Sequence, residues 1–400
     1  MYCRVMHRVL LLGAGKIGRM IARLLIDSGD YTVTVGDVIP AALERIASRV
    51  SGVQTRAVDV DSPAQLSAAL RECDTVISAL SYFYNPRVAE AALVAGVSYF
   101  DLTEDVSTTE RVREIASSAR DGQIFMPQCG LAPGFISIVA QHLTHRFERL
   151  DSVRMRVGAL PLFPTGALKY NLTWSTDGLI NEYCNPCDAI HDSRRVELLP
   201  LEGYEQFSLD GVWYEAFNTS GGLGTLCESL NGLVRELDYK TVRYLGHCSA
   251  VSLLVNELRL GERREVLKDI LESAVPVTFQ DVVVTFCAVT GWRNGQLAQI
   301  TDARKMYHKE ISGENWSAIQ VTTAAGICAA LDMFVAGLLP RRGFVRQEQV
   351  DFDVFLANRF GKHYDSQIST RFGGGATFSP VKVASPASLA TPASRESAEP

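Results

Sequence analysis

The sequence predicts an α/β protein, with a parallel sheet covered by helices and a second, α+β domain inserted after it. From residue 8 to about residue 130, short apolar runs alternate with helical repeats, as in a parallel sheet with helices on both faces. From about residue 150, alternating and valine-rich segments replace that pattern, which is typical of a separate α+β domain.

Composition narrows the classes of protein to consider. The chain has 400 residues, and 47% of them are hydrophobic, which excludes a disordered or collagen-like chain. Its net charge of −6 argues against nucleic acid as the main partner. Nine cysteines without a signal peptide pattern predict reduced thiols in a cytoplasmic protein. Met6 is a possible start, because the first predicted element begins at Arg8.

Strands and helices alternate regularly through the first part of the chain. An apolar strand at 8–13 ends in glycine, and the helix that follows over 16–28 stops at Gly29. The next predicted elements are a strand at 32–36, a helix at 40–49, a strand at 53–58, a helix at 62–72, a strand at 75–80, a helix at 85–95 and a strand at 98–101.

The second part of the chain reads differently. Residues 153–157 alternate like a half-exposed strand of an antiparallel sheet, and 277–289 predict another strand of that sheet. The apolar segment 315–339 is long enough to cross a bilayer, but it carries Asp332 and has no second candidate span beside it. We therefore predict a buried helix that packs back onto the first domain, and no membrane partner.

A G-x-G-x-x-G loop follows the first strand and opens the first helix. Gly13 permits the tight turn, Gly15 lets a pyrophosphate approach, and Gly18 allows close packing of the helix. Lys16 and Ile17 begin the helix, whose N-terminal amides suit phosphates. The motif predicts a Rossmann-type dinucleotide-binding domain; the alternative is a glycine-rich turn without a ligand.

Polar groups follow the other predicted strands. Asp37 ends the second strand, where a carboxylate binds the ribose hydroxyls and repels a 2′-phosphate, so NAD is expected rather than NADP. Ligands of such sheets bind beyond the carboxyl ends of the strands, so the fourth strand's end should contact the cofactor. The residues expected there are Ser78, Ala79 and Leu80.

Four further residues are candidates for the interface between cofactor and substrate. Tyr82, Asp101 and Glu104 follow the fourth and fifth strands, although Asp101 could instead cap a helix and Tyr82 could pack on the nicotinamide without reacting. For Glu104, a structural role is favoured over a role at the interface between cofactor and substrate. Cys129 lies in the rigid turn leading to the second domain, where it could line the cleft or serve as a small buried hydrophobe.

The second domain offers groups for a zwitterionic ligand. Arg243 and Lys240 lie three residues apart beside Tyr239, and a guanidinium suits a carboxylate. Glu182 and Asp177 could face an ammonium group. The alternatives are an exposed salt bridge for Lys240 and a structural ion pair for Glu182.

Two other signals are weaker. The Cys184 and Cys187 pair with His191 resembles part of a zinc site, but no second pair completes it, so no metal is predicted. The glycine-rich segment 220–224 lacks the residues of a phosphate loop, and we expect it to let the backbone approach a substrate.

Several motifs together resemble the saccharopine dehydrogenase/lysine 6-dehydrogenase family over about residues 8–370. The segment 215–226 is most similar to the NAD-dependent lysine 6-dehydrogenases. The resemblance implies a Rossmann domain, an inserted substrate domain and a homo-oligomer, dimer or tetramer. It also suggests Cys129, Asp101 and Tyr82 as catalytic residues. The motifs are those at 13–18, 76–82, 130–134, 179–183 and 237–247.

These observations define the expected organisation and reaction. The predicted parts are a dinucleotide-binding domain at 1–135, a substrate and oligomerisation domain at 136–314, a C-terminal segment at 315–372 and a disordered tail at 373–400. The expected reaction oxidises the CH–NH bond of an amino acid with NAD, foremost as an L-lysine 6-dehydrogenase that gives 2-aminoadipate 6-semialdehyde and ammonia. A glutamate-forming saccharopine dehydrogenase, a carboxynorspermidine-type reductase and a non-catalytic dinucleotide-binding protein remain alternatives.

Overall fold

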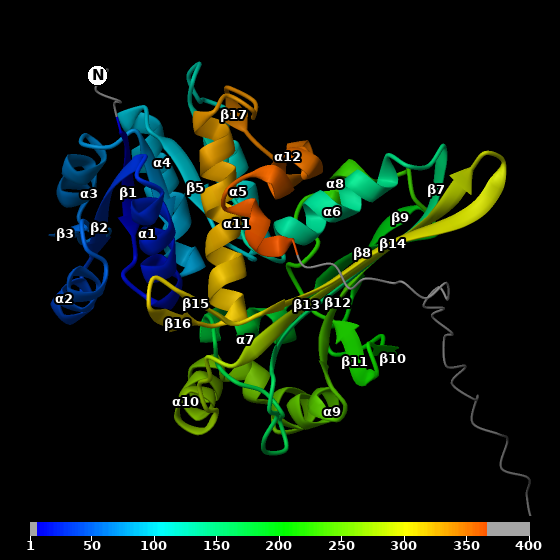
Figure 1. Cartoon of the computed structure of the whole chain (residues 1–400). Coiled ribbons are helices and arrows are strands. Elements are labelled where there is room, and N and C mark those ends of the chain that lie inside the picture. Colours follow the sequence, from blue (N-terminus) through cyan, green and yellow to red (C-terminus); the bar gives the residue numbers. More distant parts are fainter. Residues whose placement is uncertain (1–5, 366–400) are drawn as a thin grey trace, which may run out of the picture.

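Two sheets form the framework of the protein, and the chain passes from the first to the second and back (Figure 1). The computed structural model describes residues 6–365. The predicted disordered tail lies outside these described residues, as does Cys3.

The first sheet is parallel, and the α/β prediction is confirmed. Its strands run in the order β17-β6-β5-β4-β1-β2-β3. The order reverses between β1 and β4, which is where sheets of this kind bind their ligands. The bounds are β1 His7–Leu12, β2 Tyr31–Asp37, β3 Gln54–Ala57, β4 Thr75–Ser78, β5 Ser98–Asp101, β6 Ile124–Met126 and β17 Gly343–Phe344.

Helices cover both faces of this sheet because its strands are apolar on both sides. In β1, Val9 and Leu11 point into the core formed with α1 and α2, while Leu10 and Leu12 point into the core formed with α3, α4 and α5. Gly29 ends α1 in the left-handed conformation, with φ of 78°. The helices are α1 Lys16–Ser28, α2 Pro40–Arg49, α3 Pro63–Leu70, α4 Asn85–Ala95 and α5 Val106–Ala116.

The second sheet is mixed rather than antiparallel. Its main order is β10-β11-β12-β7-β13-β14, and β8 pairs with β12 and β9. Because β7 pairs with β12 in parallel and with β13 antiparallel, it is a central strand. The bounds are β7 Arg149–Pro161, β8 Cys187–His191, β9 Arg194–Leu198, β10 Glu205–Leu209, β11 Val212–Asn218, β12 Glu236–Tyr244, β13 Asp281–Arg293 and β14 Gln296–Tyr307.

Two expectations for this sheet were wrong in detail. The strand predicted at 277–289 begins only at Asp281. Residues 153–157 lie in the buried middle of β7 instead of on a half-exposed strand. Arg156 explains the second error, because its guanidinium is fully buried and ion-paired with Glu205 and Asp238. From the sequence alone, a buried arginine that is neutralised by ion pairs cannot be distinguished from an arginine that faces solvent.

The long helix α11 (Ala318–Val335) returns the chain to the first domain, where it lies against α1. It is long and apolar enough to cross a membrane, and 78% of it is buried inside the protein. Its N-terminus begins with a Ser317 capping box, and Asp281 accepts hydrogen bonds from the amides of Ala318 and Ile319. Because Asp281 starts β13, this contact joins the second sheet to α11.

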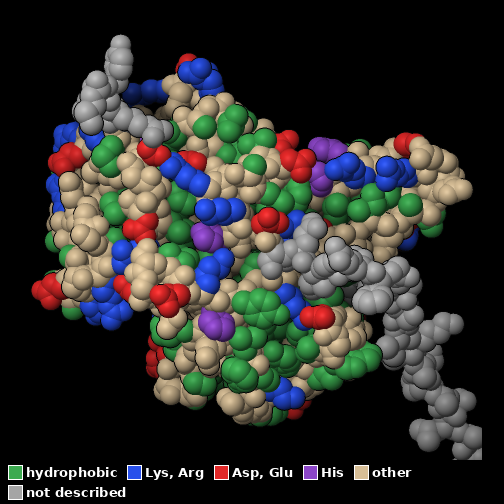
Figure 2. Space-filling model, viewed as in Figure 1, with side chains coloured by type: hydrophobic (Ala, Val, Ile, Leu, Met, Phe, Trp, Pro, Cys, Tyr) green, Lys and Arg blue, Asp and Glu red, His purple; other side chains and the backbone are tan. Residues whose placement is uncertain are grey.

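The remaining elements connect and cover the two sheets. Apart from short 3-10 and π-helical turns, they are α6 Phe135–Thr144, α7 Thr176–Cys184, α8 Leu226–Ser229, α9 His247–Ser252, α10 Arg264–Ala274, β15 Lys309–Ile311, β16 Glu314–Trp316 and α12 Phe352–Ala357. On the face shown in Figure 2, acidic and basic side chains are interspersed, and hydrophobic side chains gather over the second domain around α9. Leu253 and Leu258, just after α9, are exposed.

Replacing Asp281 by alanine should destabilise the protein by about 1–3 kcal/mol, because two buried amides of α11 would lose their acceptor. Thermal unfolding of Asp281→Ala measures the loss. The exposed Asp269→Ala, on α10, is the matched control and should unfold like the wild type. Equal melting temperatures for the two variants would contradict this role for Asp281.

Candidate active site

A cavity lies between the two domains, beyond the carboxyl ends of β4 and β5. The first domain supplies the loops after these strands and the turn at 130–133. The second domain supplies parts of β7, β12 and α7. The polar and aromatic side chains that face the cavity include Tyr82, Glu104, Trp174, Glu182, Tyr239 and Arg243.

The glycine loop fits a dinucleotide phosphate. Gly13 has a φ of 105°, and a side chain at Gly18 would lie 1.9 Å from the Gly13 carbonyl oxygen, so both positions require glycine. A Cβ at Gly15 would meet nothing within 4 Å, so the backbone faces open space there. In the described part of the chain, no side chain caps the N-terminus of α1. Its free amides and the open space at Gly15 together form a site for a phosphate.

Two of the predicted cofactor-binding residues, Asp37 and Lys16, lie close to the glycine loop. Asp37 accepts hydrogen bonds from the amides of Ala14 (2.7 Å) and Ile39 (2.9 Å), which holds its carboxylate at the end of β2. Lys16 lines a second hollow beside the start of α1, together with Arg19 and Arg45.

Other cofactor candidates lie at the main cavity. Ile17, Ala79 and Leu80 line it. Ser78 does not, since its hydroxyl is buried and donates to Asn85 Oδ1 at 2.7 Å. Ser78 therefore supports the start of α4 rather than facing a ligand.

A buried guanidinium forms part of the second-domain wall. Arg243 donates from Nε to the Tyr183 hydroxyl at 3.1 Å and from Nη1 to the Val242 carbonyl at 2.9 Å. Its guanidinium carbon lies 4.8 Å from the centre of the Tyr170 ring. Nη2 lies 3.9 Å from Glu182 Oε2, too far for a hydrogen bond. This side of the guanidinium is therefore available to a ligand.

Two residues behind Arg243 hold it in place. The Tyr183 hydroxyl lies 3.0 Å from His247 Nε2, and His247 Nδ1 lies 2.6 Å from the Leu168 carbonyl oxygen. Burial and the Arg243 charge lower the pKa of His247 to about 3, so the ring is neutral. Since the carbonyl can only accept, Nδ1 carries the proton, and Nε2 accepts from Tyr183. This chain of contacts fixes the hydroxyl that receives Arg243 Nε.

Two carboxyl groups face the same cavity. Glu182 is 7% exposed, and burial raises its pKa to about 8, although Arg243 acts in the opposite direction. Glu104 is half-buried, but its Oε1 is closed to solvent and has no hydrogen-bond partner within residues 6–365. Burial raises the pKa of Glu104 to about 7. Both groups can therefore exchange a proton near neutral pH.

Glycines from the second domain pack closely around Glu104. A Cβ at Gly221 would lie 2.4 Å from the Glu104 carbonyl oxygen, and one at Gly178 would lie 3.1 Å from its Oε1. A Cβ at Gly222 would lie 2.2 Å from the Tyr239 ring. The segment 220–224 thus brings backbone against two residues of the cavity wall, whereas the sequence predicted an approach to the substrate itself.

The structure does not bring Asp101 and Cys129 to the cavity. Asp101 is fully buried and accepts from the Tyr99 hydroxyl (2.7 Å) and the amides of Thr103 (2.9 Å) and Gln128 (3.1 Å). Cys129 is also buried, and burial raises the pKa of its thiol well above the usual value. Both residues lie beneath the cavity and tie its loops together. Of the three expected catalytic residues, Tyr82 alone lines it.

Lys240 also lies outside the cavity. Its Nζ contacts Glu205 Oε2 at 2.8 Å and the Gly203 carbonyl oxygen at 2.6 Å. Neighbouring side chains alternate across a strand, so Tyr239 and Arg243 share one face of β12 and Lys240 takes the other. The second acidic candidate, Asp177, is ion-paired with Lys268 at 2.9 Å.

Sequence reasoning missed the aromatic surroundings of Arg243. Tyr183 and His247 lie in two of the motifs that carry the family resemblance, and that was the available signal for them. No pattern pointed to Trp174 or Tyr170, whose indole Nε1 and hydroxyl oxygen are 3.0 Å apart. The folding of the loop before α7 brings Trp174 and Tyr170 together.

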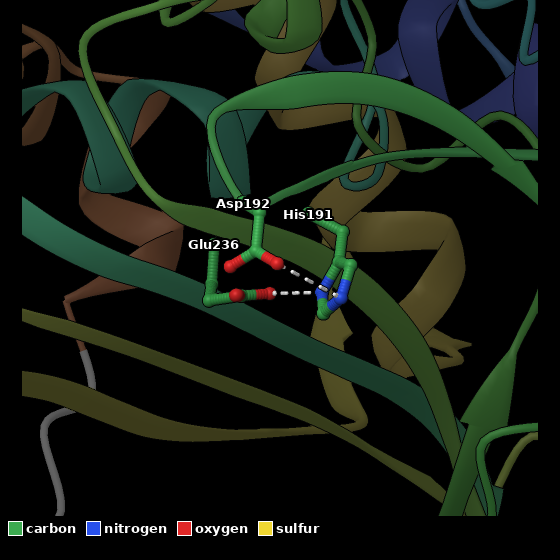
Figure 3. Close-up of side chains that lie close together, drawn as sticks. All are labelled: His191, Asp192 and Glu236. Atoms are coloured by element: carbon green, nitrogen blue, oxygen red, sulfur yellow. Dashed lines mark hydrogen bonds and ion pairs between the residues drawn. The ribbon is translucent and has the colours of Figure 1, made fainter.

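A cluster of possible metal ligands lies elsewhere, at the turn between β8 and β9 (Figure 3). His191 Nδ1 is 3.0 Å from Glu236 Oε2, and Asp192 is beside them. Arg235 donates to Glu236 at 2.7 Å, lies 3.9 Å from Asp192 and also pairs with Asp151 at 3.0 Å, so a cation already belongs to this cluster. Cys184 and Cys187 take no part in the cluster. We assign no metal to it.

Comparison with known proteins places both domains in one family. Residues 9–126 match the family model described as the saccharopine dehydrogenase NADP binding domain, and residues 130–363 match the saccharopine dehydrogenase C-terminal domain. The structure of apo histidine-tagged saccharopine dehydrogenase (L-Glu forming) from Saccharomyces cerevisiae has a TM-score of 0.72, at 18% identity, and covers 90% of this chain and 98% of that one. It shows that the folds are alike.

Curated relatives are more distant in sequence. The mitochondrial alpha-aminoadipic semialdehyde synthase of Bos taurus is 22% identical over 302 residues, which cover 71% of this chain and 31% of the relative. Saccharopine dehydrogenase (NADP(+), L-glutamate-forming) of Saccharomyces cerevisiae is 27% identical over 179 residues, covering 43% of this chain and 39% of the relative. The chain thus spans less than half the length of these relatives.

The open space at Gly15 predicts how a side chain there would act. Gly15→Val should fold normally, because a Cβ meets nothing within 4 Å, but it should weaken NADH and NADPH binding about tenfold or more by blocking a phosphate contact. Fluorescence titration with both dinucleotides measures this. Ala95→Val, at the exposed end of α4, is the control. Wild-type affinity in Gly15→Val would show that no phosphate binds at this loop.

Proposed function

The chain belongs to the saccharopine dehydrogenase family, and on this premise we propose that it is an L-lysine 6-dehydrogenase. The proposed reaction oxidises the carbon–nitrogen bond at the end of the lysine side chain with NAD and yields 2-aminoadipate 6-semialdehyde and ammonia. The observation that carries this choice of substrate is the set of charges lining the cavity.

Within the described residues, that lining contains one guanidinium, from Arg243, and two carboxyl groups, from Glu104 and Glu182. Lysine carries one carboxylate and two ammonium groups, which is the complementary set. Saccharopine carries three carboxylates and would leave two of them without a cation in this cavity, at a high cost in desolvation. The charges therefore favour a diamino monocarboxylate.

The groups near Arg243 suit the α-amino acid end of the substrate. The free side of the guanidinium can hold the carboxylate by charge-assisted hydrogen bonds. Glu182, 3.9 Å away, is at a suitable separation to receive the adjacent α-ammonium group. Trp174 and Tyr239 supply apolar surface for the methylene chain.

The other end of the substrate then points toward the first domain. The glycine loop, Asp37, Ile17, Ala79 and Leu80 would hold the dinucleotide. When bound, the oxidised dinucleotide supplies the hydride acceptor, which no side chain can provide. The protein contributes orientation of the substrate carbon, charge pairing at both ends and removal of a proton from the reacting nitrogen.

The direct test follows NADH formation by absorbance with a panel of lysine, saccharopine and cadaverine, the last being lysine without its carboxylate. We expect the highest kcat/KM with lysine. A preference for saccharopine would instead identify the glutamate-forming saccharopine dehydrogenase activity. Absence of turnover with every amine would leave a dinucleotide-binding protein without this reaction.

Arg243→Lys should lower kcat/KM for lysine roughly tenfold to a hundredfold, because an ammonium cannot reproduce the planar pair of donors. Turnover of cadaverine should change little, since it has no carboxylate to bind. NADH affinity and melting temperature, measured on the same sample, serve as controls. An equal loss with both amines would mean that Arg243 does not bind the carboxylate.

The cofactor preference should depend on Asp37. We expect NAD to give the higher kcat/KM in the wild type, because the carboxylate binds ribose hydroxyls and repels a 2′-phosphate. Asp37→Ala should narrow the ratio of kcat/KM values for NAD and NADP about tenfold. The ratio is measured for both proteins at one pH and salt concentration. A wild type that uses NADP faster would contradict this expectation, and the matched family model, described as NADP binding, makes that comparison necessary.

A further inference from the structure

We propose that Glu104 is the residue that takes the proton from the reacting nitrogen of the substrate. This inference rests on the proposed function and adds the catalytic base to it. The sequence alone favoured a structural role for Glu104, so the proposal depends on where the fold places its carboxyl group.

The reaction requires such a group. The side-chain ammonium of lysine has an unperturbed pKa of about 10.4, and in that form its nitrogen has no lone pair to assist the loss of hydride. In the proposed step, one N–H bond breaks, its electron pair stays on nitrogen, and an O–H bond forms on the Glu104 carboxylate. Nothing is oxidised or reduced, and charge is conserved.

The position of Glu104 distinguishes it from Glu182. Glu104 comes three residues after the end of β5, on the first domain, and it lines the cavity together with Ser81 and Tyr82 from the loop after β4. Glu182 comes from α7 on the second domain and lies beside Arg243. We therefore expect a lysine held by its carboxylate at Arg243 to place its α-ammonium group beside Glu182 and its far end beside Glu104.

The surroundings of Glu104 leave its carboxyl group free to accept a proton. Within residues 6–365, Oε1 has no hydrogen-bond partner and no cation forms an ion pair with Glu104. Burial is the main cause of its raised pKa, the Asn181 side chain acts to lower that pKa, and the charges of Asp105 and Asp101 add to the increase.

Other titratable groups face the same cavity from the packed elements. They are Glu182 on α7, Tyr82 after β4, and Tyr239 and Arg243 on β12. Glu104 is ionised, and able to act as a base, above a pKa of about 7.

The other candidate bases of the first domain are less suitable. The Asp101 oxygens already accept three hydrogen bonds, from Tyr99, Thr103 and Gln128. Cys129 is buried under the cavity and its Sγ lies 3.1 Å from the Met126 carbonyl oxygen. On this side of the cavity, Glu104 is the carboxyl group that lines it.

The experiment compares pH profiles of kcat for the wild type and Glu104→Gln with saturating NAD and the best amine of the panel. The kcat of the wild type should rise with increasing pH and level off above about pH 7, because Glu104 must be ionised to act as a base; this rise is the limb near pH 7. Glu104→Gln should lose about a hundredfold to ten-thousandfold in kcat. Its remaining rate should rise toward about pH 10.4, where the amine loses its proton in solution. NADH affinity and melting temperature should stay close to wild type.

Two further variants separate a base from a structural residue. Glu104→Ala should recover part of its rate when formate is added, because a small carboxylate can enter the space left by the side chain. Glu182→Gln should raise KM for lysine and keep the limb near pH 7, since its role is to pair with the α-ammonium group.

Three outcomes would overturn parts of this account. A limb near pH 7 that persists in Glu104→Gln, or full activity of that variant, excludes Glu104 as the base while the lysine activity of the wild type stands. Loss of the limb in Glu182→Gln would assign the base to Glu182. A wild type that oxidises no amine of the panel overturns both the proposed function and this inference.

Discussion

The site depends on a guanidinium buried at the boundary between the two domains. Removing a charged group from water costs several kcal/mol unless its donors and its charge are compensated. The fold compensates Arg243 with the Tyr183 hydroxyl, the Val242 carbonyl and the face of Tyr170, and Glu182 supplies opposite charge nearby when it is ionised. These groups come from β12, α7 and the loop before α7, so the cation constrains how the three are arranged.

The first domain forms the opposite wall of the cavity, and a buried carboxylate rather than a buried cation positions that wall. Asp101 accepts from the amide of Thr103 in the loop after β5 and from the amide of Gln128 after β6, and the loop after β5 carries Glu104 into the cavity. Glycines at 178 and 221 let the second domain close on Glu104 without a steric clash. Among residues 6–365, the cavity lining thus contains one permanent cation and two carboxyl groups with raised pKa values, contributed from both sides of the domain boundary.

Family membership explains the architecture but not the choice of substrate. The two matched models cover most of the chain, and the solved relative shares its fold at 18% identity. At that distance, side chains that contact the substrate can differ while the sheets stay the same. The charges that line the cavity are therefore the appropriate basis for choosing between lysine and a tricarboxylate, because they belong to this chain.

The sequence by itself determined the strands, the helices and the dinucleotide loop, since these follow from short-range periodicity and from glycines at fixed offsets. Arg243 and Glu182 were also named as candidate ligands from their residue types, and both line the cavity. Strand parity could have separated Lys240 from Arg243, because side chains three apart on a strand face opposite sides. Only the tertiary structure decided that Asp101 and Cys129 lie beneath the cavity and that Glu104 enters it. Burial depends on contacts between segments distant in the chain, and no local pattern encodes them.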